Sequence, residues 1–158
     1  MWKSEKQKKD TYELMIQQLT GLTEIEHDVI ANLANSSALL ADALPDTVFA
    51  GYYLYNGDEL VLGPFQGKVS CTRIKLGKGV CGESAEKQKT LIVDNVKTHE
   101  NYISCDSAAM SEIVVPMVKD GVLLGVLDID SGVTFSYDAI DQEYLEKFAA
   151  VLIDQSNF

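Results

Sequence analysis

Apolar side chains recur at helical spacing in three stretches, two near the start of the chain and one at its end. The first runs to about Leu19 and is expected to stop at Gly21. The second follows Thr23 and Glu26, which have the spacing of a capping box, and the third covers residues 138–155. The pattern therefore predicts two N-terminal helices and one closing helix.

Between these helices the pattern changes to strand-like runs, rich in β-branched and aromatic residues and separated by turn residues. We expect strands over 47–55, 59–65, 69–76, 91–93, 111–118 and 122–130, and a short helix over 80–88. The turns Asn56-Gly57 and Asp120-Gly121 indicate that the strands they join run antiparallel. The chain is therefore expected to have an α+β fold, a central antiparallel sheet with the N- and C-terminal helices packed mainly on one face.

The composition is that of one ordinary globular domain over residues 1–158, in which residues 1–10, with four lysines, are expected to form a mobile head. The net charge of -11 argues against binding to nucleic acid or to an anionic membrane, because phosphate groups are held by basic surfaces. No apolar run has the length of a spanning helix, and the first ten residues lack the apolar core of a secretory signal. We therefore expect a cytoplasmic protein, whose cysteines do not form permanent bridges.

Three cysteines are the candidate reactive groups, and each lies in a different kind of segment. Cys71 falls in a predicted strand, where a lone thiol is usually a small buried hydrophobe. Cys81 is at the start of the short helix, whose free N–H groups favour a thiolate. Cys105 lies in the polar stretch 94–110, and loops of that length tend to be lids or binding segments. The gaps between these cysteines and His99 do not match a zinc motif, so we expect no metal.

The last two predicted strands carry three carboxylates. Asp128 and Asp130 share one face because strand side chains alternate. Glu112 joins them only in one register: a two-residue turn pairs Ile113 with Asp128 and points Glu112 away, whereas a three-residue turn over 119–121 pairs Glu112 with Asp128. If the three groups converge, their repulsion raises at least one pKa, and together they attract an ammonium group. The alternative is that the aspartates merely end a strand at the surface.

Several segments together resemble the free methionine-(R)-sulfoxide reductases, small enzymes of the GAF fold. They are GYYLY, the run from GPFQG through VCGESAEKQKTLIVDNV, the loop cysteine, SEIVVP and LGVLDIDS. The resemblance covers nearly the whole chain. It implies reduction of the R epimer of free methionine sulfoxide, no bound cofactor, and thioredoxin or a similar dithiol as the external reductant. It also implies pairing of two chains into a homodimer through the N-terminal helices.

The resemblance also implies roles for the cysteines. The family's nucleophile falls on Cys105, which attacks the sulfoxide and becomes a sulfenic acid, and a second thiol then forms a disulfide with it. Cys71 and Cys81 are both candidates for that second thiol, and Cys71 is the first choice.

The substrate-binding positions of the family fall on Glu112, Asp128 and Asp130, one acid donating a proton while its neighbours hold the ammonium. An aromatic wall falls on Phe49 and Tyr52. The family often has tryptophan where this chain has Phe49, so the apolar subsite is expected to be looser.

Two other functions stay open from the residues alone. One is a GAF module that does no catalysis and senses a small molecule or an oxidant through its thiols. The other is reduction of methionine sulfoxide within proteins, which an acidic site for a free ammonium group should reject.

Overall fold

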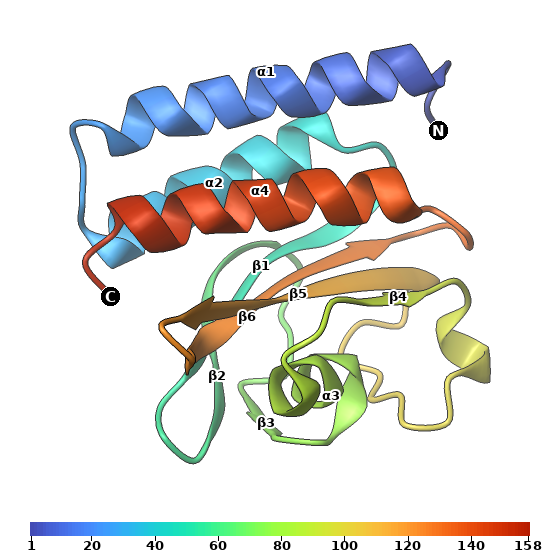
Figure 1. Cartoon of the computed structure of the whole chain (residues 1–158). Helices are drawn as coiled ribbons and strands as arrows, with labels where there is room; N and C mark the ends of the chain where they lie inside the picture. The colour runs from blue at the N-terminus through green and yellow to red at the C-terminus, as the bar shows by residue number, and fades with distance from the viewer.

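Six antiparallel strands form one sheet, in the order β3-β2-β1-β6-β5-β4, in the computed structural model, which describes residues 1–158 (Figure 1). The strands are β1 (Thr47–Tyr55), β2 (Glu59–Gly67), β3 (Arg73–Lys75), β4 (Leu91–Val93), β5 (Ser111–Lys119) and β6 (Val122–Ser131). The helices are α1 (Glu5–Thr23), α2 (Val29–Ala43), α3 (Gly79–Lys87), the 3-10 turn η1 (Val96–Thr98) and α4 (Ala139–Gln155).

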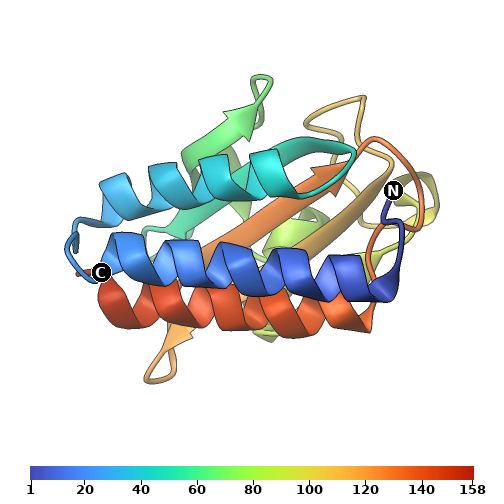
Figure 2. The same ribbon diagram turned by 90° about the horizontal axis from the view of Figure 1, so that it is seen from above.

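Three long helices cover one face of the sheet. α2 packs on β1 and β2, α4 packs on β5, and α1 lies over both helices as an outer layer. Seen from above, the three helices run side by side with α1 between the other two (Figure 2). The main core lies between this layer and the sheet, and includes Leu33, Tyr52, Ile113, Leu127 and Phe148. The predicted α+β fold, with N- and C-terminal helices on one face, is confirmed.

The boundary between α1 and α2 differs from the prediction. α1 continues past Gly21 to Thr23, whose hydroxyl donates a hydrogen bond to the carbonyl of Leu19 one turn earlier. That hydroxyl is therefore not available to cap the next helix. Asp28 caps α2 instead, because its carboxylate accepts a hydrogen bond from the backbone N–H of Ala31.

The expected mobile head is wrong for residues 5–10, which form the first turns of α1. Lys8 is buried there, and its ammonium group donates to Asp138 at 2.9 Å and to Asp141 at 2.5 Å. The hydroxyl of Tyr12 donates to Asp141 at 2.6 Å. These contacts join the start of α1 to the start of α4.

None of the helices has both the length and the apolar character to cross a membrane.

The other face of the sheet is covered by α3 and by the two loops that precede β3 and β5 (Figure 1). The predicted strand over 69–76 shortens to Arg73–Lys75, so Cys71 lies in a loop and the strand prediction is wrong for it. A second core cluster fills the space beneath α3, and it includes Phe49, Tyr53, Val114 and Val126.

The buried ion pair of Lys8 gives a test of how α1 is held. We expect Lys8→Ala to lower the free energy of unfolding by about 3 kcal/mol, because it leaves the carboxylate of Asp141 buried without its cation. Lys9→Ala removes an exposed pair with Glu5 on the same helix and should leave the free energy of unfolding nearly unchanged, because water screens that pair. Urea unfolding measures both, and equal losses from the two variants would contradict this role of Lys8.

Candidate active site

The register of three neighbouring strands brings all three predicted carboxylates to the α3 side of the sheet. Asp130 lies opposite Phe49 of β1 and opposite Glu112 of β5. Asp128 lies two residues along β6, opposite Gly51, and shares the face of Asp130. The predicted convergence of the carboxylates is therefore observed.

The pairing that produces this convergence is neither of the two registers considered from the sequence. The turn has two residues, because Lys119 pairs with Val122, and this alone would point Glu112 away. A bulge then follows: Val118 pairs with Leu123 while Met117 pairs with Gly125, so that Leu124 is the extra residue. The bulge returns Glu112 to the face of the aspartates, where it faces Asp130 directly and Asp128 diagonally.

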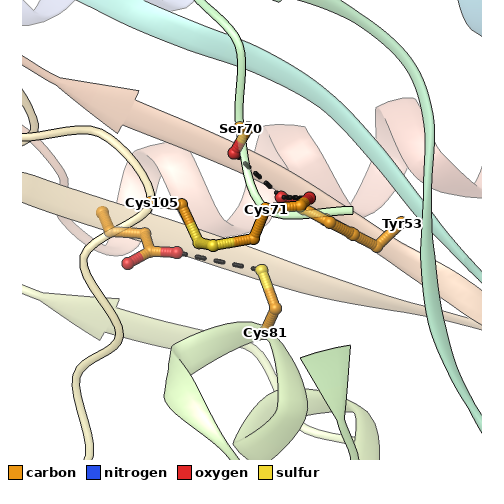
Figure 3. Close-up of a disulfide and its surroundings, with 6 residues drawn as sticks. Tyr53, Ser70, Cys71, Cys81 and Cys105 are labelled. Carbon is orange, nitrogen blue, oxygen red and sulfur yellow. Dashed lines mark hydrogen bonds between the residues drawn. A yellow bond between two sulfur atoms is a disulfide. The ribbon is translucent and has the colours of Figure 1, made fainter. Parts of the chain in front are cut away.

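A disulfide between Cys71 and Cys105 joins the loop before β3 to the loop before β5 (Figure 3), and Cys105 lines the same cavity as the three carboxyl groups. Both cysteines are partly exposed. Tyr53 of β1 positions the first loop, since its hydroxyl donates to the carbonyl of Cys71 at 3.0 Å and shares a hydrogen bond with Ser70. Of the two candidate partners for Cys105, Cys71 is the one bonded to it.

Cys81 is the free thiol, and it is 4% exposed. It points from α3 toward the disulfide, and its sulfur donates a hydrogen bond to Oε1 of Glu112 at 3.9 Å. Burial raises the pKa of Cys81 well above its usual value, and the charges of Asp128 and Glu112 raise it further. The expectation that a helix N-terminus would favour its thiolate is therefore wrong, because desolvation beside acids outweighs the helix dipole.

The three carboxyl groups lie next to one another without a cation; Glu112 and Asp128 are buried, and Asp130 is half-buried with one oxygen shielded from solvent. Glu112 and Asp128 are each 5% exposed, and one carboxylate oxygen of Asp128 and one of Asp130 have no hydrogen-bond partner. Burial raises the pKa of Asp128 to about 6. Burial, and then the charges of Asp128 and Asp130, raise the pKa of Glu112 well above its usual value. The pKa of Asp130 is raised in the same direction, by burial and the charge of Asp128.

The aromatic residues of β1 divide between the two faces. Tyr53 lines the site, and Phe49 lies behind it, stacked on Phe65 with ring centroids 5.2 Å apart. Tyr52 is on the opposite face, where its hydroxyl bonds to Ser36 of α2, so its predicted place in the aromatic wall is wrong. Strand alternation was the signal that could have found this, because positions 49 and 53 share a face and position 52 does not.

Tyr102, Ile103 and Cys105 close the site from the side of the long loop. The cavity between these residues and the acids has a volume of about 20 Å³, room for about one water molecule. Its lining contains no lysine or arginine. A larger cavity of about 190 Å³ lies between Trp2 and the β6–α4 connection, but it has no thiol. We place the candidate site at the smaller cavity, where the thiols and the unpartnered acids meet.

Comparison with known proteins identifies the family. Residues 30–152 match the model of the GAF domain. The chain is 46% identical to Protein YtsP of Bacillus subtilis, over 92% of this chain and 90% of that protein. It is 44% identical to the free methionine-R-sulfoxide reductase of Escherichia coli, over 80% of this chain and 77% of that protein.

A solved structure agrees with these sequence matches. The free methionine-R-sulfoxide reductase of Neisseria meningitidis, determined in complex with its substrate, is 41% identical and superposes with a TM-score of 0.90. The match covers 94% of this chain and 89% of that one. The chain therefore belongs to the GAF-domain family, in the branch of the free methionine-R-sulfoxide reductases.

Proposed function

We propose that this protein is an oxidoreductase that reduces free L-methionine-(R)-sulfoxide to methionine. The observation that carries the proposal is a disulfide between two partly exposed cysteines, one of which lines the same cavity as three carboxyl groups that have no cation of their own. The thiols supply two electrons, and the carboxyl groups suit a substrate with a free ammonium group. The names of the relatives supply the substrate class.

In the reaction the two reduced thiols take turns. The thiolate of Cys105 attacks the sulfoxide sulfur, the oxygen passes to Cys105 as a sulfenic acid, and methionine is released. The thiol of Cys71 then attacks that sulfenic acid, which forms the Cys71–Cys105 disulfide and releases water. An external dithiol, thioredoxin in our proposal, reduces the disulfide and is itself oxidised. A supply of dithiol places the cycle in the cytoplasm.

The acids divide between two tasks. Glu112, whose pKa is raised well above its usual value by burial, is the acid that gives its proton to the departing sulfoxide oxygen. Asp128, with its pKa of about 6, is ionised at neutral pH and binds the substrate ammonium. The arriving cation then lowers the pKa of Asp130, so that it too ionises and joins the ammonium site. Cys81 has no redox task here, because its buried thiol is held against Glu112.

A coupled assay tests the reaction. We expect NADPH consumption when free methionine-(R)-sulfoxide is added to the protein with thioredoxin and thioredoxin reductase. A peptide with a blocked amino terminus should not be reduced, because it brings no ammonium group to the carboxylates. Absence of NADPH consumption with the free amino acid would remove the enzyme proposal and leave a non-catalytic sensor.

The same assay assigns the thiols. Cys105→Ser should abolish turnover, whereas Cys71→Ser should complete one turnover and stop with a sulfenic acid on Cys105, detectable by mass spectrometry after trapping. Cys81→Ser is the matched control and should retain repeated turnover. If Cys71→Ser turns over repeatedly while Cys81→Ser stops after one cycle, the roles of these two cysteines are exchanged.

Substrate binding should depend on pH through Asp128. As pH falls through the pKa of about 6, Asp128 becomes neutral and loses its attraction for the ammonium. We expect the Kd of free methionine-(R)-sulfoxide to rise by up to about tenfold per pH unit below that value. Calorimetry on the Cys105→Ser variant measures binding without chemistry, and Asp128→Asn is the control that should bind weakly at every pH. A constant Kd across this range would contradict the role of Asp128.

Replacing Glu112, the proposed proton donor, should lower the activity and raise the stability of the protein. Burial raises the pKa of Glu112, so the folded state is penalised at every pH above the ordinary pKa of an unfolded glutamate, about 4.3. At neutral pH we expect Glu112→Gln to raise the free energy of unfolding by about 1 to 3 kcal/mol while slowing turnover. The gain should shrink as pH falls toward 4, where the wild-type group is protonated in both states.

Urea unfolding over this pH range measures the gain. Glu24→Gln, at an exposed position beyond α1, is the control and should change neither stability nor turnover. A loss of stability in Glu112→Gln at neutral pH would contradict the buried-acid explanation.

A further inference from the structure

Three potential metal ligands, one thiol and two carboxyl groups, meet at the cavity. Cys81 of α3, Glu112 of β5 and Asp128 of β6 each place one ligand atom within 4.8 Å of the other two, and all three side chains are buried. Cys105 lines the same cavity from the opposite side. When the Cys71–Cys105 disulfide is reduced, a second thiol therefore faces these three donors.

A second observation shows that the chain does not satisfy this cluster by itself. Asp128 lines the cavity, and its Oδ1 is buried and has no hydrogen-bond partner. No lysine or arginine borders the cavity to balance the acids. A buried carboxylate oxygen without a donor or a counter-ion is a place for a cation.

The donor set selects the kind of cation. Calcium and magnesium take oxygen ligands, whereas a thiolate combined with carboxylates suits zinc. Zinc holds sulfur at about 2.3 Å and carboxylate oxygen at about 2.0–2.2 Å, so a tetrahedral site separates the two ligand atoms by about 3.5 Å. The sulfur of Cys81 lies 3.9 Å from Oε1 of Glu112, which requires only a small inward shift.

We propose that the reduced protein binds one zinc ion through Cys81, Glu112 and Asp128, with Cys105 as the fourth ligand, and that this ion blocks the site. The thiols and any protonated carboxyl group each release a proton to solvent as they coordinate the metal, and no electrons are exchanged, because zinc is not redox-active. The ion takes the place of the substrate ammonium and holds the nucleophile. The disulfide form lacks the ligand from Cys105 and binds zinc more weakly.

Calorimetric titration with zinc chloride tests the site directly. The protein is first reduced with a phosphine, which is then removed under nitrogen, and the titration is run in two buffers of different ionisation enthalpy to count the protons released. We expect one zinc per chain, proton release, and binding at least about tenfold tighter than in the disulfide form. Cys81→Ser and Asp128→Asn should each weaken binding at least about tenfold.

His99→Gln is the matched control. His99 is a potential zinc ligand on the long loop, but its Nε2 contacts Glu83 at 3.0 Å and it lies outside the cluster. Its replacement should leave zinc affinity unchanged. Far-UV circular dichroism confirms that each variant is folded, and Asp128→Asn serves if Cys81→Ser does not fold.

Three results would overturn the proposal. They are equal affinity in the reduced and disulfide forms, full affinity in both Cys81→Ser and Asp128→Asn, and a loss in His99→Gln as large as theirs. In the coupled assay zinc should raise the KM for methionine sulfoxide and leave kcat unchanged, and a chelator should reverse the effect. Because calorimetry needs no substrate, zinc binding without any turnover would contradict the proposed function alone, and turnover without zinc binding would contradict this site alone.

Discussion

The register of β5 against β6 decides which of their side chains face the helices and which face the candidate site. A shift by one residue would move Glu112 under the helices and turn the side chain of Ile113 into the cavity. The bulge at Leu124 sets the observed register. Gly125 beside it has no side chain, so β1 can approach β6 closely at this point. A Cβ at Gly125 would lie 2.3 Å from the carbonyl oxygen of Tyr53. One extra residue and one missing side chain thus decide which groups face the thiols.

The groups of the candidate site lower the stability of the folded protein. The site holds two buried carboxyl groups, a half-buried third and a buried thiol without a cation, and desolvation raises the pKa of each of these groups. The opposite face compensates with a continuous apolar core between the sheet and three helices. The buried pair of Lys8 and Asp141 adds a polar link within that helical layer. The larger apolar core and the reactive groups therefore lie on different faces of one sheet, and the smaller apolar cluster beneath α3 supports the face that carries the site.

Much of this arrangement could be predicted from the sequence because it follows from local patterns. Alternation placed Asp128 and Asp130 together, and both the short helix expected over 80–88 and the closing helix extend over nearly the expected residues. Several features could not be predicted in this way. The bulge at Leu124 has no signature in hydrophobic spacing, and the burial of Lys8 depends on carboxylates about 130 residues away. The clustering of Cys81 with two strand acids depends on tertiary packing, which the long gaps between them hide.

The position of Tyr52, by contrast, could have been predicted correctly. Side chains alternate along a strand, which places Tyr52 on the face opposite Phe49. Tyr53 carries the role at the site and contributes more than an aromatic surface, since its hydroxyl holds the loop of Cys71.

The disulfide form has a cavity of about 20 Å³ beside a disulfide whose two cysteines are partly exposed. An amino acid cannot enter such a space, yet a protein reductant can reach the sulfurs from outside. Under the proposed cycle the two reactants therefore never compete for the oxidised protein. Formation of the Cys71–Cys105 disulfide thus separates reduction of the sulfoxide from reduction of the protein. One site in one small domain can then react first with a small substrate and next with a much larger protein.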